Sequence, residues 1–276
     1  MLQLLVGFLL SLAIALAAYQ RRALSGSGAA GTVAVGTAIF GAAGLEWGLL
    51  LVTFFVTSSA LSRYQETRKE AVAEKFAKGS RRDLGQVLAN GGLGALLAIT
   101  YRLSEADWVW AAYAGAIASV NADTWATELG VLSRQLPRLI TGGREVEAGT
   151  SGGVTTEGTL AAFAGSVLIA VGAVVFSRLA GRPSSHPGPL LLAVTAAGLC
   201  GALLDSLLGA TVQQIYFCPA CGKETERHPV HRCGATTQPL RGWRWLNNDG
   251  VNFLSSAVGA GVAAGLWMWL GSAGGW

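Results

Sequence analysis

The sequence has 276 residues, of which 51% are hydrophobic and only 13% are charged, and its net charge is +4. An ordinary soluble domain has about a quarter of its residues charged, so this composition excludes a soluble globular protein and indicates a chain whose solvent is lipid. The positive excess suits anionic headgroups or phosphates, and it gives no reason to expect nucleic acid as a partner.

Eight apolar stretches approach the length of about 20 helical residues that crosses a bilayer. The second and third are short and are separated by Glu46 alone, so either two helices or one interrupted helix is possible there. The pattern predicts an all-α polytopic membrane protein with about eight transmembrane helices in a single integral membrane domain, residues 1–276. The stretches run from Leu2 to Ala18, Ala29 to Leu45, Trp47 to Leu61, Gln86 to Tyr101, Trp108 to Leu132, Thr156 to Phe176, Pro189 to Val212 and Val251 to Leu270.

The basic residues orient the predicted helices. Of the 20 lysines and arginines, only Arg102, Arg178 and Arg182 lie on one side of the predicted membrane. Because cytoplasmic loops carry the positive excess, both termini are predicted to lie outside. The first stretch has no basic segment before it, so we interpret it as a retained helix rather than a cleaved signal peptide. Since no Arg- and Ser-rich transit segment precedes it, we expect a prokaryotic plasma membrane.

Polar side chains gather at the cytoplasmic ends of the predicted helices. At about 1.5 Å per helical residue, Asp123 and Asp205 both lie roughly 20 Å or more from the outer surface. A Gly-rich cytoplasmic loop precedes the sixth stretch. Five segments therefore present carboxylates, amides and hydroxyls at one depth, which is the main functional signal of the sequence. These residues are Asn90, Asn121, Asp123, Glu128, Thr150, Ser151, Gly152, Gly153, Asp205, Asn247, Asn248, Asp249 and Asn252.

Two of these carboxylates suggest a metal ion. Asp123 and Asp205 would repel each other at a matched depth unless a cation lay between them, and Mg²⁺ takes oxygen ligands together with water and substrate phosphates. The alternative is that the polar groups hydrogen-bond between helices or cap helix ends. For Asn247 in particular, a cap and a functional role are both open.

A second candidate metal site lies in the last predicted cytoplasmic loop, residues 213–246. Cys218 and Cys221 have a chelate spacing, and His231 and Cys233 follow. Three thiolates and one imidazole form a closed tetrahedral zinc site, which would be structural because no coordination position stays open. His228 is the alternative fourth ligand, and unpaired thiols are the alternative to zinc.

Two short motifs carry little weight. Gly26, Gly28 and Gly31 fit the pattern GxGxxG, but a membrane helix rather than a strand precedes them. Gly149, Ser151 and Gly153 fit GxSxG without a preceding strand. Neither match supports a dehydrogenase or a hydrolase, and the phosphate-binding pattern GxxxxGK[ST] does not occur in the sequence.

Several longer motifs do resemble one known family. They include NADTWATE from Asn121, GTSGGV from Gly149, QVLANGG from Gln86, and WLNND from Trp245, together with Asp205-Ser206. From about residue 25 onward, the sequence resembles the transmembrane protein 19 family, which includes plastid phytyl-phosphate kinase and is distantly similar to dolichol and phytol kinases. The resemblance implies a kinase that uses a nucleoside triphosphate, CTP in particular, to convert a prenyl monophosphate such as phytyl or geranylgeranyl phosphate into its diphosphate.

The candidate residues suit that chemistry, in which positioning and charge neutralisation dominate. We expect Asp123 and Asp205 to hold Mg²⁺, with Asn121 and Glu128 completing the catalytic set. The loop from Thr150 to Gly153 would cradle the donor. Asn121 would also orient phosphate oxygens, together with Asn90 and Asn248, and the acceptor phosphate would be screened by Arg82 and Arg138. The binding set also includes Asn247, Asp249 and Asn252.

Other functions fit the same polar cluster. A cytidylyltransferase would release different products, and a prenyl-alcohol kinase would need a carboxylate as general base. A transporter would place its polar site near the midplane with access from both sides. A zinc-dependent assembly protein without catalysis is a further alternative.

Overall fold

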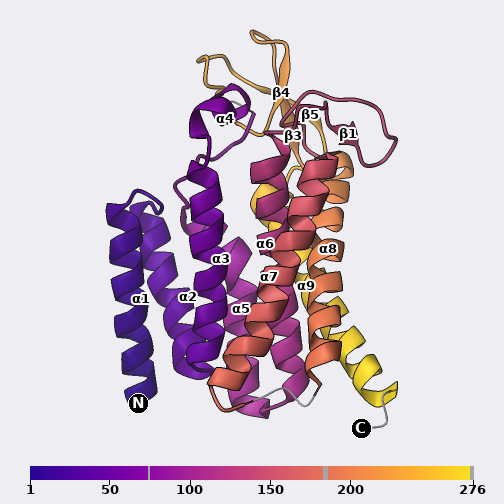
Figure 1. Ribbon diagram of the computed structural model, residues 1–276. Helices are drawn as coiled ribbons and strands as arrows, with labels where there is room; N and C mark the ends of the chain where they lie inside the picture. The colour runs from indigo at the N-terminus through magenta and orange to yellow at the C-terminus, as the bar shows by residue number, and fades with distance from the viewer. Residues whose placement is uncertain (74, 183–185, 274–276) are drawn as a thin grey trace.

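The computed structural model describes residues 1–73, 75–182 and 186–273, and it is dominated by long helices (Figure 1). Eight of these helices coincide with the eight predicted apolar stretches. The prediction of an all-α polytopic membrane protein is therefore confirmed. The helices are α1 (Leu2–Gln20), α2 (Gly26–Ala42), α3 (Leu45–Arg63), α5 (Leu84–Ser104), α6 (Asp107–Gly130), α7 (Thr156–Leu179), α8 (Pro187–Thr211) and α9 (Asn248–Ala273).

Six of the helices are long and apolar enough to cross a membrane by length and composition alone. The two exceptions are α2, which has 17 residues, and α6, which carries several polar side chains. The second and third stretches form two separate helices. Gly44 makes the turn between them at a φ of +119°, a conformation that favours glycine.

Helix α6 lies at the centre of the bundle, where it packs against α3, α5, α7, α8 and α9. Every residue from Val109 to Ala122 is buried. Small side chains allow this close approach, because a Cβ on Gly115 would lie only 2.6 Å from the carbonyl oxygen of Gly259 in α9. The polar residues at the end of α6 are thereby held at fixed positions among five neighbouring helices.

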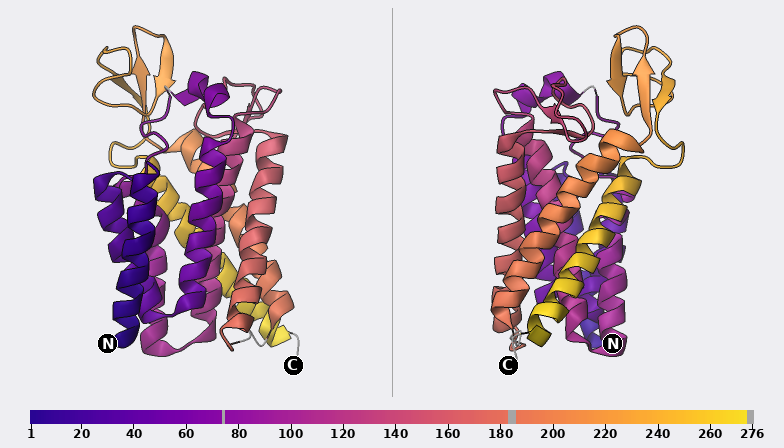
Figure 2. Two further views of the ribbon diagram at one scale, coloured as in Figure 1. Left: turned by 60° about the vertical axis from the view of Figure 1, so that its left-hand side comes forward. Right: turned by 90° about the vertical axis from the view of Figure 1, so that its right-hand side faces the viewer.

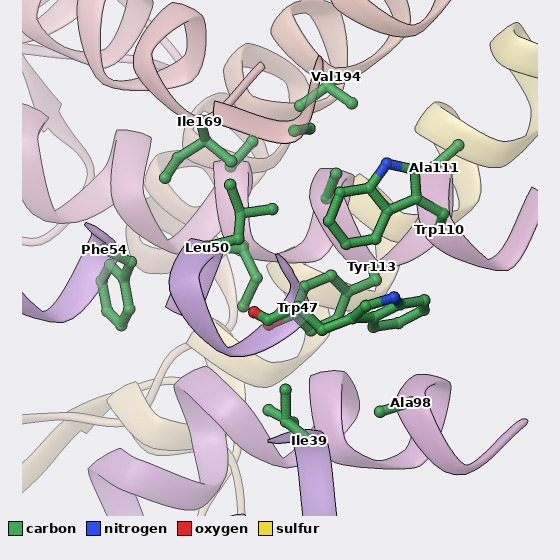
Figure 3. Close-up of a cluster of buried hydrophobic side chains, with 14 of the residues drawn as sticks. Ile39, Trp47, Leu50, Phe54, Ala98, Trp110, Ala111, Tyr113, Ile169 and Val194 are labelled. Atoms are coloured by element: carbon green, nitrogen blue, oxygen red, sulfur yellow. The ribbon is translucent and has the colours of Figure 1, made fainter. Parts of the chain in front are cut away.

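Aromatic side chains fill the half of the bundle in which α3 and α6 begin (Figure 3). Trp47 packs against Trp110 and Tyr113 with ring centroids 5.0 and 4.5 Å apart, and the Tyr113 hydroxyl donates to the Trp47 carbonyl over 2.6 Å. Ile169 and Val194 extend this core toward α7 and α8. This half of the bundle is packed mainly with apolar residues, and its buried carboxylate Glu46 is paired with Arg182 at 3.4 Å.

Small elements cover one end of the bundle, which we call the loop end. Here lie α4 (Glu66–Ala73), the two-stranded sheet of β1 (Arg138–Leu139) and β2 (Gly153–Val154), and a three-stranded sheet of order β4-β3-β5. Both chain termini lie at the opposite end (Figures 1 and 2), as an even number of spans requires. The strands of the larger sheet are β3 (Ile215–Cys218), β4 (Lys223–Thr225) and β5 (Gln238–Arg241), and all are antiparallel.

Candidate active site

A polar cavity of about 550 Å³ lies at the loop end of the bundle. Its walls come from α3, α5, α6, α7, α8 and α9 and from the loops above them. The structure thus brings together the segments that the sequence placed at one depth. The predicted residues that line the cavity are Arg82, Asn90, Asp123, Glu128, Thr150, Ser151, Gly152, Gly153, Asp205, Asn247, Asn248, Asp249 and Asn252.

Asp123 of α6 and Asp205 of α8 face this cavity and are close enough to interact electrostatically. Asp205 Oδ2 accepts a hydrogen bond of 3.2 Å from Ser255 of α9. Within the described part of the chain, the Asp123 carboxylate has neither a hydrogen-bond donor nor a cation in contact. Two oxygen-donor groups that repel each other in one cavity suit a hard divalent cation such as Mg²⁺. Two carboxylates supply fewer ligands than a Mg²⁺ ion takes, so water and substrate phosphates would complete its coordination shell.

A third carboxylate reaches the cavity from an element outside the bundle. Glu226 follows β4 and accepts hydrogen bonds from the Ala77 amide at 3.3 Å and from Gln213 Nε2 at 2.8 Å. It interacts electrostatically with both Asp123 and Asp205. Burial raises the pKa of Glu226 despite these two hydrogen bonds. The sequence does not indicate this role, because Glu226 lies within the Cys and His motif, apart from the motifs on the helices, and reaches the cavity only through the fold of its loop.

Two lysines at the cavity wall were not among the predicted site residues. The sequence indicated only that they belong to the many basic residues on the cytoplasmic side. Lys69 pairs with Glu128 at 2.6 Å, and Glu128 also accepts from Ser62 at 2.5 Å. Glu128, which was expected in the catalytic set, is thus engaged in an ion pair at the cavity wall.

The second of these lysines joins two helix ends. Lys78 contacts Asp83 at 2.9 Å and Asp249 at 2.5 Å, and so links the start of α5 to the start of α9. Burial alone would lower the pKa of Lys78, but the hydrogen bonds that it donates to the two carboxylates, together with their negative charge, outweigh burial and raise that pKa. Asp83 also caps α5 through a reciprocal pair of hydrogen bonds with Gln86. The network fixes the entrance of the cavity between α5 and α9.

Arg82 lies where the polar cavity meets the apolar interior. Its side chain is 9% exposed, donates to Ser59 Oγ at 2.8 Å, and lies over the rings of Phe54 and Phe55. Burial lowers the pKa of the guanidinium to about 10, although Glu128 acts in the opposite direction. No carboxylate of the described residues forms an ion pair with it. Arg82 is therefore a buried cation without a direct counter-ion, which is costly unless an anion arrives.

The Gly-rich loop is seated on the end of α8. Gly152 has a φ of +83°, and a Cβ there would lie 2.4 Å from the Ala210 side chain, so only glycine fits. Ser151 Oγ donates to Gln213 Oε1 over 2.9 Å. The amides of Thr150 and Gly153 are used by bonds within the loop and to Glu147. The amides of Ser151 and Gly152 have no backbone acceptor in the described structure, so they are the ones that could face a phosphate.

Two amide side chains from the predicted set behave differently. Asn90 lines the cavity, and its buried Oδ1 atom has no hydrogen-bond partner among the described residues. Asn247 Oδ1 accepts from the Gly250 amide at 3.0 Å and thereby caps the first turn of α9. Asn247 consequently serves the helix end and the cavity wall at once.

The structure places Asn121 and Arg138 outside the cavity. Asn121 is fully buried, donates to the Gly165 carbonyl of α7 at 2.8 Å and accepts from Thr57 of α3 at 3.3 Å. Both halves of its amide therefore join helices, which is the structural alternative that the sequence left open. Arg138 is exposed and pairs with Glu145 at 2.9 Å. The expected phosphate contacts of these two residues have no support from their positions.

The Cys and His residues of the loop between α8 and α9 do converge. The ligand atoms of Cys218, Cys221, His231 and Cys233 all lie within 4.8 Å of one another. Individual separations are 3.6 Å between the sulfurs of Cys218 and Cys233 and 3.3 Å between His231 Nδ1 and Cys233 Sγ. A tetrahedral zinc site with bonds of about 2.3 Å to sulfur has edges of about 3.8 Å, so the four residues fit a metal ion.

The fourth position of this cluster belongs to His231. The other candidate, His228, stacks on Tyr216 with ring centroids 4.3 Å apart and contacts Thr237 Oγ1 at 3.3 Å. The cluster lies outside the cavity and has no open ligand position, so its chemistry is that of a structural site. The cluster lies in the same loop as Glu226 and Arg232, which line the cavity.

Comparison with known proteins identifies the family. The family model of the integral membrane protein DUF92 matches residues 9–260, which include every part of the cavity and the Cys and His cluster. The chain is a member of the DUF92 family of integral membrane proteins. This membership confirms the family resemblance drawn from the sequence motifs.

Family members come from plants and archaea. Protein PGR of Arabidopsis thaliana is 36% identical over 271 residues, which cover 92% of each chain. An uncharacterized membrane protein of Methanocaldococcus jannaschii is 34% identical over 215 residues, covering 78% of this chain and 85% of the relative. The chloroplastic protein VTE6 of Arabidopsis thaliana is 28% identical over 247 residues, covering 87% of this chain and 64% of the relative. No solved structure matches the chain.

Proposed function

We propose that this DUF92 member is a membrane phosphotransferase that uses a nucleoside triphosphate, CTP in particular, to phosphorylate a prenyl monophosphate. Phytyl and geranylgeranyl phosphate are the acceptors that the family resemblance suggests, and the product is the corresponding diphosphate. The observation that carries the proposal is a cavity at one end of the bundle, lined by half-buried carboxylates and by cations. Such a cavity can be reached by a soluble nucleotide and by a phosphate anchored in lipid.

The reaction needs little acid–base help from the protein. A phosphate monoester is already anionic near neutral pH, so one of its oxygens attacks the γ-phosphorus directly. The bond between that phosphorus and the β,γ-bridging oxygen breaks, and the nucleoside diphosphate leaves with the electron pair. The protein must hold two polyanions in line and neutralise their charge.

The residues around the cavity suit these two tasks. Arg82 would bind the acceptor phosphate, while the amides of Ser151 and Gly152 and the side chain of Asn248 would face the donor. Asp123 and Asp205 would hold Mg²⁺, which when bound neutralises the phosphate oxygens and orients them. Glu226 faces the same two carboxylates from the opposite wall, and this adds to the affinity of the cavity for a cation.

Sidedness and location form part of the proposal. The loop end carries most of the basic residues, so we place it in the cytoplasm of a prokaryotic cell, with both termini outside. The cavity then opens to the compartment in which nucleoside triphosphates are found. The zinc cluster would keep the loop between α8 and α9 folded over the cavity and would take no part in the chemistry.

A product assay tests the proposal. The purified protein in lipid nanodiscs is supplied with phytyl, geranylgeranyl or farnesyl phosphate and with CTP or ATP in parallel. We expect a prenyl diphosphate and an equal amount of nucleoside diphosphate. Release of CMP and pyrophosphate would instead identify a cytidylyltransferase, and phosphorylation of the prenyl alcohol alone would identify an alcohol kinase. Solute flux without any phosphoryl transfer would favour the transporter alternative.

A further inference from the structure

A second, apolar pocket lies beside the polar cavity, among the first three helices and α5. Helix α1 contributes Ile14, α2 contributes Val35 and Phe40, α3 contributes Val52, and α5 contributes Val87. The pocket is narrow, with a volume of about 60 Å³. It therefore suits a length of one hydrocarbon chain better than two chains side by side.

The two spaces adjoin each other, since they share part of their lining. Arg82, Gln86 and Asn90 line the apolar pocket and also line the polar cavity. A head group bound at Arg82 would therefore have the polar cavity on one side and the apolar pocket, which suits an apolar chain, on the other. Gln86 and Asn90 lie in the first two turns of α5 and Arg82 lies just before that helix, so this segment lines both spaces where they adjoin.

Arg82 determines the kind of head group that fits this junction. It is the only charged residue on the wall of the apolar pocket, and in the described structure it lacks a carboxylate partner. Its position is fixed independently of the side chain, because the Arg82 amide donates to Ala23 O and its carbonyl accepts from the Ser25 amide, both at 3.0 Å. A buried guanidinium in a fixed place binds a phosphate through two parallel hydrogen bonds. Asn90, whose buried Oδ1 has no hydrogen-bond partner among the described residues, adds a second polar side chain to the lining of both spaces, and its amide nitrogen can donate to a phosphate.

We propose that this pocket binds the first isoprenoid units of the acceptor and that Arg82 binds its phosphate, so that the acceptor enters the site from the side of α1, α2, α3 and α5. The inference deepens the proposed function by assigning one wall to the lipid substrate. It leaves the opposite wall, with the loop of Ser151 and Gly152, to the nucleotide. The occupant is a single-chain phosphate monoester, since its chain suits the narrow pocket and its dianionic head suits the unpaired arginine.

Photolabelling tests this assignment without any need for catalysis. The probe is a prenyl monophosphate that carries a diazirine on its first isoprenoid unit, added to the protein in nanodiscs without nucleotide. We expect peptides of α1, α2, α3 and α5 to be labelled and phytyl phosphate to compete. Labelling that is confined to α7, α8 or α9 would overturn the proposal. Equal competition by phytol or by phosphatidylglycerol would also overturn it, because the phosphate or the single chain would then be irrelevant.

Paired substitutions on α3 sharpen the test. Val52→Trp fills the pocket, and overpacking of this kind is expected to reduce labelling about tenfold. Val56→Trp is the matched control, since Val56 lies one turn away on the same helix, is 56% exposed and lines neither space. Equal labelling of both variants would refute the pocket. Arg82→Gln provides a second route if Val52→Trp fails to fold, and unchanged labelling of that variant would remove the arginine from the proposal.

The labelling result separates this inference from the proposed function. If pocket labelling succeeds but no nucleotide supports phosphoryl transfer, the lipid site stands and the kinase proposal fails. If transfer is observed while the label lies elsewhere, the kinase stands and the pocket assignment fails.

Discussion

Replacing Arg82 by methionine separates a ligand-binding arginine from a structural one. The fall in the pKa of the guanidinium from 12.5 to about 10 corresponds to a burial cost of about 3 kcal/mol. Because a base with a lowered pKa is penalised while it is charged, this cost is present at neutral pH and is relieved only above about pH 10. Opposing it are contacts with two rings, worth about 1 kcal/mol each, and one charged hydrogen bond worth about 1.5 kcal/mol.

These opposing contributions nearly cancel in the ligand-free protein. Arg82→Met is therefore expected to change the free energy of unfolding by less than about 1 kcal/mol, whereas breaking a buried ion pair costs about 3–5 kcal/mol. Loss of the charged hydrogen bonds to the ligand should weaken the binding of phytyl phosphate about 10- to 100-fold.

Two measurements distinguish a ligand-binding role of Arg82 from a structural one. Reversible unfolding in mixed micelles gives the stability of the ligand-free protein, and calorimetric titration of phytyl phosphate gives its Kd. Arg82→Lys is a useful intermediate, because it keeps the charge but loses the fork geometry that holds a phosphate. A destabilisation of about 3 kcal/mol or more with an unchanged Kd would refute the reasoning and make Arg82 a structural residue.

Three further predictions concern the other residues of the site. Asp123→Asn and Asp205→Asn should each slow the formation of CDP from CTP and phytyl phosphate at least about 100-fold. Asp107→Asn is the control, since Asp107 is exposed at the opposite end of α6, and it should leave the rate unchanged. Full activity of either cavity variant would exclude a catalytic role for that residue. Cys221→Ser should remove the bound zinc, measured by mass spectrometry of the purified protein, while His228→Ala should retain it. Zinc retained by Cys221→Ser would argue against the site, and zinc lost from His228→Ala would make His228 a ligand in place of His231. Asn121→Ala should lower the stability by about 1 kcal/mol with little change in KM, because the amide joins α3 to α7; a large change in KM at unaltered stability would return it to the binding set.

Local properties of the sequence were enough to predict the helices, the polar end and the cluster of Cys and His residues. Lipid imposes a fixed length and an apolar composition on each span, so the eight helices could be recognised without knowing their packing. The spacing of Cys218 and Cys221 is a chelate whatever surrounds it. Asp123 and Asp205 could be placed at a common depth because a helix rises by a constant amount per residue.

Only the tertiary structure decided which polar groups share a space. Asn121 and Asp123 are two residues apart on α6, yet the first is used in helix packing and the second faces the cavity. Glu226 reaches the cavity through the fold of a loop, and Lys69 does so through its ion pair with Glu128. The physical reason is that depth along a helix follows from chain position, whereas the direction of a side chain and its partners depend on how neighbouring helices rotate and pack.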